Sequence, residues 1–337
     1  MRMDESTDLT EQLIDLSVGY LRSAALHAAA HWRIADLLAD GPRSADDLAA
    51  EAGLDASHLA RVLRYLAAHG VFRQEDDGRF ALTPLAGLLR DDVPGSMRAY
   101  VDVHGHDIFL RSAAGLIDAL RTGGNPFEAA FGMPFYQYLF ANRELGMKFD
   151  TSMASFSERL SDQVAAAYDF GSARRVVDVG GGRGGQLRAI LRRNPHLEGT
   201  LMDLEPVVAG HVLDEPELSG RWSAVGGDFF SAVPEGGDVY ILKHVLASWP
   251  DEKCVEILEM CRRAMPDDGR LLMVNALVPE GNEPHPSKTV DMTMLTVLNG
   301  KGRTQAEYEE LMRKAGLASS RVLHVSPHAA IIEAAKG

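Results

Sequence analysis

The sequence predicts an α/β fold in which a mostly parallel sheet, flanked by helices, follows a mostly helical N-terminal domain. Two observations predict this order. In the second half, short apolar runs alternate with helical patterns, as strands that are buried on both faces do. In the first half, two short helical patterns lead into a hairpin, which is the order of a winged helix. The predicted strands lie at 175–179, 199–203, 238–242 and 270–274, the helices at 184–193, 251–265 and 305–315, and antiparallel closing strands within 324–334.

The N-terminal half has clear helix signals. Apolar residues from Leu9 to Tyr20 recur at spacings of 4, 3 and 4 residues, which places them on one helix face. Ser44 and Asp47 resemble a capping box at the start of the first winged-helix segment, and an acidic turn at 75–78 separates the two hairpin strands. Further along the chain, we predict a helix over 97–121, ended by a GGNP run, and then an aromatic segment at 127–140.

Composition excludes several classes of protein. The chain has 34 basic and 48 acidic side chains and a net charge of −14, which argues against a DNA-binding role for the winged helix. No apolar stretch approaches the ~20 residues that span a bilayer. The first residues are acidic rather than basic, so we expect no signal peptide. We therefore predict a cytoplasmic protein with neither a membrane nor a nucleic-acid partner.

The cysteines and histidines predict neither a disulfide nor a metal site. Cys254 and Cys261 are seven residues apart on one predicted helix, a rise of ~10 Å along the axis, which is too far for a disulfide. His104 and His106 lack the further ligands that a closed metal site needs.

A glycine-rich run, DVGGGRGG at 178–185, ends a predicted strand and begins a predicted helix. Glycines let the backbone approach a ligand closely, and they leave N–H groups free at the helix N-terminus. Gly180, Gly182 and Gly185 also satisfy the G-x-G-x-x-G pattern of dinucleotide-binding loops. The run alone predicts a nucleotide-like ligand without naming it.

Two further carboxylates narrow the choice of ligand. Asp203 ends the next predicted strand, 25 residues after Asp178, where a carboxylate can accept both hydroxyls of a ribose. Asp228 follows after another 25 residues and can accept an adenine amino group, while Phe229 offers an apolar face to the purine. A nicotinamide oxidoreductase, the alternative, needs only the first carboxylate. S-adenosylmethionine (SAM), with one ribose and one adenine, fits better.

Five motifs in order resemble those of the small-molecule O-methyltransferases of the caffeic-acid and hydroxyindole type, a family that includes bacterial tailoring enzymes of antibiotic pathways. They are VVDVGGGRG at 176–184, LMDLEPVV at 201–208, GDFF at 227–230, VYILKHVL at 239–246 with Trp249, and DMTML at 291–295. The resemblance covers essentially the whole chain. It implies a class I SAM-dependent methyltransferase with a Rossmann-like, mostly parallel seven-stranded sheet. It also implies a winged-helix dimerisation domain at 1–100, a helical linker contributing to the substrate pocket at 101–165, a SAM-binding domain at 166–337, and a homodimer.

The resemblance also implies roles for individual residues. Asp203 would bind the ribose of SAM, Asp228 and Phe229 would hold the adenine, and Lys243 would lie near the polar end of the cofactor. Trp249 would pack on the purine. The predicted cofactor residues are Asp178, Gly180, Gly181, Gly182, Asp203, Leu204, Asp228, Phe229, Lys243 and Trp249. The predicted substrate pocket comprises Phe149, Met153, Asn275, Met292 and Met294.

The catalytic base of the family has no counterpart in this sequence. Where the family has His-Asp-Trp, with the histidine as general base for a phenol, this chain has Ala247-Ser248-Trp249. The two acidic positions that orient the family's histidine are Asn275 and Gly302 here. Methyl transfer tolerates such a loss, because alignment of the reacting atoms contributes most of the acceleration and a base adds ~10² to 10⁴-fold. Candidate replacements for the base are His104, His106, Tyr136 and Tyr138.

The predicted function is therefore SAM-dependent methylation of a small aromatic metabolite in specialised biosynthesis, by O-methylation through positioning. The alternatives are a C- or N-methyltransferase on an activated aromatic, or a SAM-binding hydroxylase or pericyclase on the same fold. The aromatic segment 127–140 is predicted to line an apolar pocket, although core packing would give the same pattern.

Overall fold

The computed structural model describes residues 8–337, apart from the side chains of Ser155, Phe156 and Arg159. The chain divides into two compact units. Unit 1 comprises the described residues up to 110 together with 142–156, and unit 2 comprises 111–141 and 157–337. In the part of the chain that the structure describes, no helix is long and apolar enough to cross a membrane.

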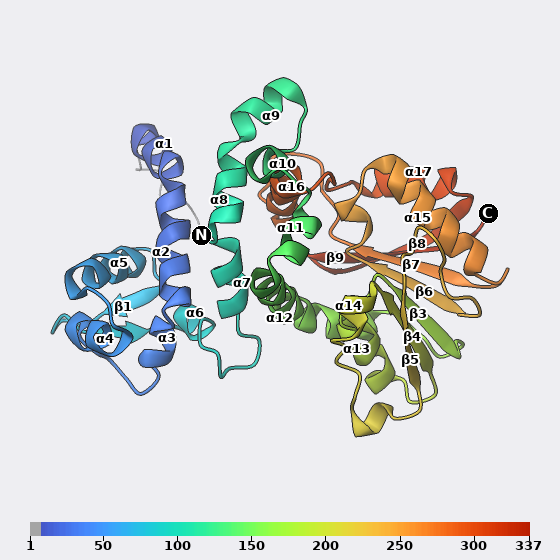
Figure 1. Cartoon of the computed structure of the whole chain (residues 1–337), viewed down its shortest axis with the longest axis horizontal. Coiled ribbons are helices and arrows are strands. Elements are labelled where there is room, and N and C mark those ends of the chain that lie inside the picture. Colours follow the sequence, from blue (N-terminus) through green and yellow to red (C-terminus); the bar gives the residue numbers. More distant parts are fainter. Residues whose placement is uncertain (1–7) are drawn as a thin grey trace. The chain divides into compact units, whose positions relative to one another are not determined.

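Unit 1 is mostly helical and contains the predicted helix–turn–helix–hairpin order (Figure 1). Its elements are α1 (Leu9–Ser17), α2 (Gly19–His31), α3 (Ile34–Leu37), α4 (Ala45–Ala52), α5 (Ala56–Ala68), β1 (Phe72–Gln74), β2 (Phe80–Leu82), α6 (Pro84–Gly87) and α7 (Arg98–His104), with parts of α8 (Asp107–Ala114) and α12 (Arg143–Ala167). Ser44 accepts a hydrogen bond from the backbone N–H of Asp47 at 3.1 Å and so caps α4, as predicted. The strands β1 and β2 pair in antiparallel fashion.

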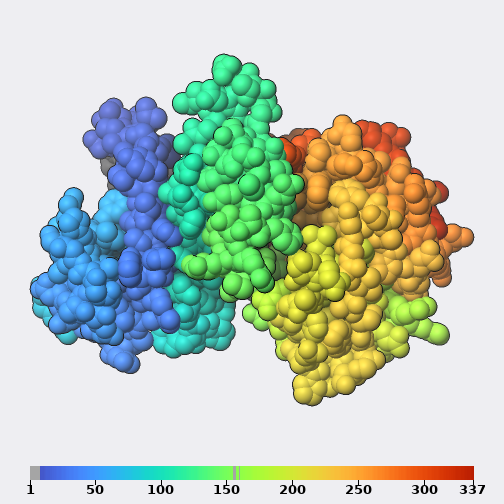
Figure 2. Space-filling model, in the orientation of Figure 1, coloured from blue at the N-terminus to red at the C-terminus, as the bar shows by residue number. Residues whose placement is uncertain are grey.

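The core of unit 1 lies between α2 to α5 and the hairpin, where Ile34, Leu48, Leu63 and Phe72 are buried. Helix α1 takes no part in it. None of its nine residues is buried, and its leucines face solvent. The predicted stripe from Leu9 to Tyr20 does not lie on one helix, because α1 ends at Ser17 and Tyr20 belongs to α2. Leu9 and Leu13 are 79% and 69% exposed. Figure 2 shows this helix, in dark blue, at the surface.

The prediction of one helix over 97–121 is wrong, because the structure has three helices there. They are α7, α8 and α9 (Leu116–Thr122), and glycines separate them at Gly105 and Gly115. Glycine is a poor helix former, so a helix ends easily at these two positions. The predicted end of this region is confirmed, since Gly123 terminates α9 in the left-handed conformation.

Unit 2 is an α/β domain built around one seven-stranded sheet, which confirms the implied fold. Its strands are β3 (Arg175–Val179), β4 (Glu198–Asp203), β5 (Trp222–Gly226), β6 (Val239–Lys243), β7 (Arg270–Asn275), β8 (Leu317–Ser326) and β9 (Ala329–Lys336). Its helices, besides the rest of α8, α9 and the end of α12, are α10 (Pro126–Phe131), α11 (Phe135–Ala141), α13 (Gly185–Arg193), α14 (Glu205–Val208), α15 (Asp251–Ala264), α16 (Pro286–Val297) and α17 (Gln305–Lys314).

The strands lie in the order β5-β4-β3-β6-β7-β9-β8. The first five are parallel, and β9 runs antiparallel to both β7 and β8, as the closing strands were predicted to do. One core lies on each face of the sheet. Residues of α15 and α17 pack with Val177 and Tyr240 on one face, and residues of α12 and α13 pack with Val176 and Ile241 on the other (Figure 1).

Candidate cofactor and active site

The strand order reverses beside β3, and we call the carboxyl-terminal edge of the sheet at this point the crevice. The chain continues from β3 to β4 on one side, while β6 lies on the other side. In an open α/β sheet, ligands bind outside the carboxyl ends of the strands where the order reverses in this way. The glycine run follows β3, Asp203 ends β4, Asp228 follows β5, and Lys243 ends β6. The predicted cofactor residues therefore gather at one edge of one sheet.

The glycine run is held against the sheet by its own backbone. The N–H groups of Gly180 and Gly181 both donate to the carbonyl oxygen of Met202, at 2.8 and 3.1 Å. Gly180 has a φ of +67°, and a Cβ atom there would come within 2.8 Å of the Val245 side chain and 3.4 Å of the Phe229 ring. Glycine is thus required for the tight turn, and α13 begins directly after it.

Asp203 ties the end of β4 to this turn. Its carboxylate accepts hydrogen bonds from the N–H groups of Gly182 and Leu204, each at 2.8 Å. Burial raises the pKa of Asp203, and these two bonds oppose the shift. A carboxylate has about four lone-pair sites, so two acceptor positions remain for a diol. At the end of the next strand, Asp228 accepts from the N–H of Phe230 at 2.9 Å.

Asp178, which is buried, and Lys243, which is partly buried, interact electrostatically beside the crevice without a direct ion pair. Burial raises the pKa of Asp178 to about 7, and the charge of Lys243 opposes this shift. Burial lowers the pKa of Lys243 to about 8, and Asp178 opposes that shift in turn. The Lys243 ammonium donates to the hydroxyl of Ser161 at 2.7 Å and to that of Ser157. Both serines belong to α12.

Sequence reasoning missed Ser157 and Ser161. They lie more than 80 residues before Lys243, and serine is common on helix surfaces. The available signal was their i, i+4 spacing, which puts both hydroxyls on one helix face. Only the packing of α12 on the sheet reveals that this face meets the end of β6.

Aromatic side chains cover one side of the crevice. The Phe230 ring lies 4.9 Å from the Trp249 ring in an edge-to-face arrangement, and Phe229 lies 5.0 Å from Phe230 between ring centroids. Together with the carboxylates at the ends of β4 and β5, these rings give the crevice a polar and an apolar side. That combination suits a ligand with hydroxyl groups and a flat heterocycle.

The segment before Trp249 is fixed by a fully buried arginine. Arg303 donates to the carbonyl oxygens of Leu246 at 3.0 Å and Trp249 at 2.8 Å, and it pairs with Asp251 at 2.7 Å. Sequence reasoning noted the glycine beside it but assigned Arg303 no role. The arginine determines the shape of the short turn that includes Ala247 and Ser248, where the family's base would stand.

Two polar side chains near this turn have hydrogen-bonding atoms that no described residue uses. Asn275, at the end of β7, is 1% exposed, and both atoms of its amide are buried without a partner. The Nε2 atom of His244 is also buried without a hydrogen-bond partner. Burial lowers the pKa of His244 to about 3, so this histidine is neutral and a weak base. Buried amides ordinarily find partners, so Asn275 is suited to a polar group of a ligand.

The remaining predicted pocket residues are divided between the two units. Met292 and Met294 lie on α16, which packs against α10, and Asn299 donates to Glu128 at 2.8 Å between these parts of unit 2. Phe149 and Met153 lie on the part of α12 that belongs to unit 1. Their predicted place beside the cofactor stays a prediction.

The candidate histidine bases also belong to unit 1, and each has a partner there. His104 is half-buried and stacks on Tyr100, with ring centroids 3.9 Å apart, and burial lowers its pKa. His106 pairs with Asp107 at 2.8 Å. A catalytic role for either histidine stays a prediction.

Part of the aromatic segment 127–140 forms a small core. Phe127 and Phe135 are buried, and the Phe127 ring lies 4.6 to 5.5 Å from those of Phe131, Phe135 and Tyr138. For Phe127 and Phe135, core packing is therefore the role that the structure assigns.

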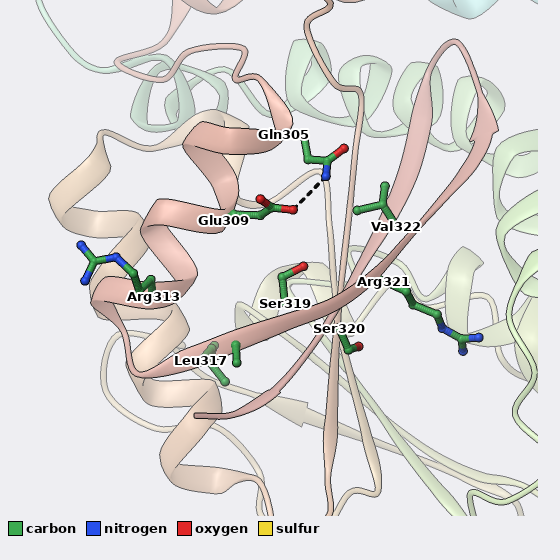
Figure 3. Close-up of a pocket in the computed structure, with 9 residues that line it drawn as sticks. Gln305, Glu309, Arg313, Leu317, Ser319, Ser320, Arg321 and Val322 are labelled. Carbon is green, nitrogen blue, oxygen red and sulfur yellow. Dashed lines mark hydrogen bonds between the residues drawn. The ribbon is translucent and has the colours of Figure 1, made fainter.

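A hollow of about 540 Å³ lies between α17 and β8 (Figure 3). It is open to solvent and lined by polar and apolar side chains, and Gln305 donates to Glu309 within it at 2.8 Å. No predicted site residue lines it. Since β8 is an edge strand remote in the sheet order from β3, this hollow is distinct from the crevice at the glycine run.

Comparisons with known proteins agree with this geometry. Residues 114–318 match the O-methyltransferase domain family, and residues 14–92 match the O-methyltransferase dimerisation domain family. The phenazine O-methyltransferase PhzM of Lysobacter antibioticus is 40% identical, over 97% of this chain and 96% of its own.

Solved structures give the same result. CalO1, a methyltransferase in calicheamicin biosynthesis in its S-adenosylhomocysteine-bound form, is 41% identical with a TM-score of 0.88, over 98% of this chain and 100% of that one. NcsB1, an O-methyltransferase from neocarzinostatin biosynthesis in complex with S-adenosylhomocysteine and 1,4-dihydroxy-2-naphthoic acid, is 34% identical with a TM-score of 0.81, over 94% and 96%. This chain therefore belongs to the O-methyltransferase family and is a SAM-dependent methyltransferase with a dimerisation domain.

Proposed function

We propose that this enzyme transfers the methyl group of SAM to a hydroxyl oxygen of a small aromatic metabolite in specialised, antibiotic-type biosynthesis. The observation on which the proposal rests is the crevice at β3, where the glycine turn and the carboxylates of Asp203 and Asp228 lie at adjacent strand ends. The similarity of this chain to a phenazine O-methyltransferase and to an O-methyltransferase from neocarzinostatin biosynthesis supports an aromatic hydroxyl as the acceptor. A C- or N-methyltransferase and a hydroxylase or pericyclase are not favoured.

The residues of the crevice fit SAM. Asp203 has free acceptor positions for the ribose hydroxyls, and Asp228 with Phe229 offers an acceptor and an aromatic face to the adenine. The turn at Gly180 to Gly182 gives a surface without side chains for the methionine part. Lys243, held by two serines, keeps Asp178 partly ionised near this polar end. When bound, the cofactor supplies an electrophilic methyl group on a sulfonium.

The chain's own residues then act mainly by orientation. The clamp of Arg303 fixes the turn at Ala247, and the unpaired amide of Asn275 is available to a hydroxyl or carbonyl of the acceptor. Alignment of acceptor oxygen, methyl and sulfur can contribute about 7–11 kcal/mol to lowering the barrier. With alanine at the family's base position, the acceptor proton leaves to solvent or to another group. An acidic hydroxyl, ionised near neutral pH, suits this mechanism.

The proposal is tested with SAM labelled in its methyl group and a panel of hydroxylated phenazines, naphthoates and quinones. We expect one class to yield a product with the label on oxygen, identified by mass spectrometry and NMR. Labelled methyl on carbon or nitrogen would contradict oxygen as the acceptor. A SAM-dependent product without label would contradict methyl transfer itself.

Restoring a base should change the pH dependence of catalysis. In an Ala247→His variant, we expect kcat on a weakly acidic phenol to rise at least tenfold, with a new limb in the pH profile near the histidine pKa of about 6.5. Ala247→Gln is the matched control, because it adds a polar side chain of similar size that cannot take up the proton. Equal changes in both variants would mean that the histidine does not act as a base at this position and that the native reaction bypasses this site.

We also propose that the enzyme is a homodimer and that α1 contributes to its interface. The exposed leucines of α1, in a chain with a dimerisation domain, support this assignment. Replacing Leu13 and Leu16 by aspartate should shift the protein to monomer in light scattering at micromolar concentration. Aspartates at Thr10 and Ser17 add the same charges without removing apolar side chains and should leave the dimer intact. Dimers of equal stability in both variants would argue against α1.

A cytoplasmic location and the absence of membrane and nucleic-acid partners stay predictions from the sequence.

A further inference from the structure

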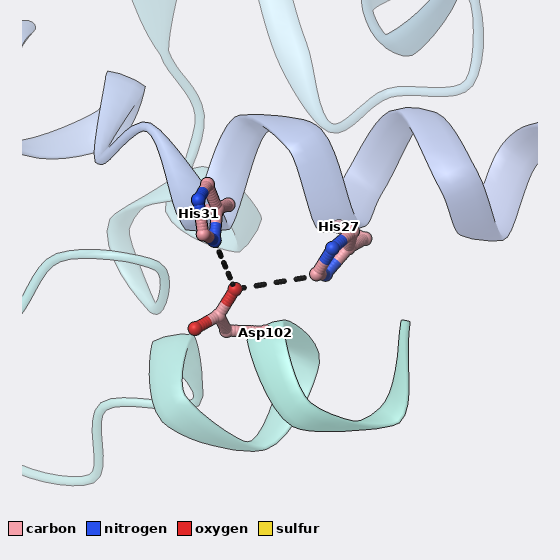
Figure 4. A group of neighbouring side chains, drawn as sticks. All are labelled: His27, His31 and Asp102. Atoms are coloured by element: carbon pink, nitrogen blue, oxygen red, sulfur yellow. Dashed lines mark hydrogen bonds and ion pairs between the residues drawn. The ribbon is translucent and has the colours of Figure 1, made fainter. Parts of the chain in front are cut away.

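Unit 1 contains a cluster of metal-ligating side chains that has no part in the cofactor crevice. His27 and His31 are one turn apart on α2, and Asp102 faces them from α7 (Figure 4). One ligand atom from each side chain lies within 4.8 Å of the other two. Sequence analysis did not find this cluster, because Asp102 is 71 residues from His31 and comes close only through packing of α2 on α7.

The distances in the cluster are close to those of a tetrahedral site. The Nδ1 atoms of His27 and His31 lie 3.6 and 3.0 Å from the same oxygen of Asp102. Zinc binds imidazole nitrogen and carboxylate oxygen at about 2.0–2.2 Å in a tetrahedron, so its ligand atoms are about 3.3 Å apart. The two observed distances lie on either side of that value. The ligand atoms of the two imidazoles lie within 4.8 Å of each other, so the rings have to turn toward each other to share one ion.

A glycine at the end of α7 allows this helix to lie close to α2. Gly105 ends α7 beside His27, and a Cβ atom at this position would overlap the Cβ and ring of His27. A side chain at position 105 would therefore push α7 and its Asp102 away from α2. The glycine keeps the carboxylate within reach of both histidines.

The protonation state of His27 also suits a metal. Burial lowers the pKa of His27, and the neighbouring His31 and His106 lower it further, while Asp102 opposes the shift. Neutral imidazole is the form that binds metals. The Nδ1 atom of His27 is buried and makes no hydrogen bond of ordinary geometry with the described residues. Lys148 also interacts electrostatically with Asp102, and it pairs with Glu144 at 2.8 Å.

We propose that His27, His31 and Asp102 form a binding site for a zinc-type divalent cation that joins α2 to α7 in the dimerisation unit. Two imidazoles and one carboxylate favour zinc, cobalt or nickel over magnesium or calcium, which prefer oxygen ligands. The side chain of His31 is 48% exposed, so the fourth position opens to solvent, where water completes the tetrahedron. The site is independent of the proposed methyl acceptor.

The test measures metal binding by untagged full-length protein that has been treated with a chelator. We expect one cobalt ion per chain, with the visible spectrum of a tetrahedral site, and displacement of cobalt by zinc at micromolar concentration. His31→Gln and Asp102→Asn should each weaken zinc binding at least thirtyfold, while SAM affinity stays unchanged. Zinc should raise the melting temperature of the wild type and of neither variant. Below pH 6, binding should weaken because protons compete for the imidazoles.

The matched control is His58→Gln. His58 also lies beside a carboxylate in unit 1, with Asp55 at 2.6 Å, and no third ligand joins that pair among the described residues. Wild-type affinity in His58→Gln supports the proposal. Failure of the wild type to bind zinc below 100 μM would overturn it, as would equal binding by wild type, His31→Gln and Asp102→Asn. Since His31 is half-exposed, its variant is expected to fold, and circular dichroism checks this.

Discussion

Asp203→Ala is expected to weaken SAM binding at least 100-fold without unfolding the protein. The carboxylate holds the N–H groups of Gly182 and Leu204, and it is the acceptor that we assign to the ribose hydroxyls. Each hydrogen bond to a charged group contributes about 1.5–3 kcal/mol, so losing two of them corresponds to a factor of about 10² or more. Isothermal titration calorimetry with SAM and with S-adenosylhomocysteine measures the loss.

Two further variants test whether the loss of affinity is specific to the Asp203 carboxylate. Asp203→Asn keeps one acceptor oxygen and should lose less affinity than Asp203→Ala. Asp214→Ala removes a carboxylate that is 82% exposed in the connection after β4, and it should bind SAM like the wild type. A folded Asp203→Ala protein with unchanged affinity would contradict the crevice at β3 as the cofactor site.

Arg303→Met is expected to lower the free energy of unfolding by about 3 kcal/mol. The guanidinium is fully buried and satisfies the carbonyl oxygens of Leu246 and Trp249 as well as Asp251. A hydrogen bond to a charged group contributes about 1.5–3 kcal/mol. Both carbonyl oxygens keep the Cys254 thiol as a weaker partner, and the methionine side chain recovers part of the loss through packing. Urea unfolding monitored by circular dichroism measures the change.

The control for this variant is Arg313→Met. Arg313 is 70% exposed and pairs with Glu310 on the surface of α17, so its loss should cost less than 1 kcal/mol. Loss of the hydrogen bond from Arg303 should also make Trp249 more mobile, and a shift of the tryptophan fluorescence would show this. Equal stability of the two variants would mean that the buried arginine is not the clamp of this turn.

Those parts of the molecule that depend on local pattern were predictable from the sequence. The strand runs beginning at Arg175 and Arg270 appear where predicted, because a strand buried on both faces needs a continuous apolar run. The glycine turn was also predictable, since few residues other than glycine adopt its backbone. The prediction of one helix over 97–121 was wrong because apolar residues continue on both sides of Gly105 and Gly115, whereas the helical backbone is interrupted at both glycines.

The unpredicted features depend on contacts between distant segments. Ser157 and Ser161 acquire a role only when α12 packs at the end of β6, and Arg303 only when it reaches the turn before Trp249. Nothing in a window of ten or twenty residues distinguishes a buried arginine from a solvated one. The cluster around Asp102 was hidden for the same reason.

The position of β9 affects how this domain folds while the chain is being synthesised. This strand is the last of the described chain, yet it lies inside the sheet, between β7 and β8. Until residues 329–336 have left the ribosome, the backbone of β7 presents an unpaired edge, which is a template for aggregation. Closure of this sheet therefore awaits the synthesis of residues 329–336, and chaperones can shield the nascent strands until then.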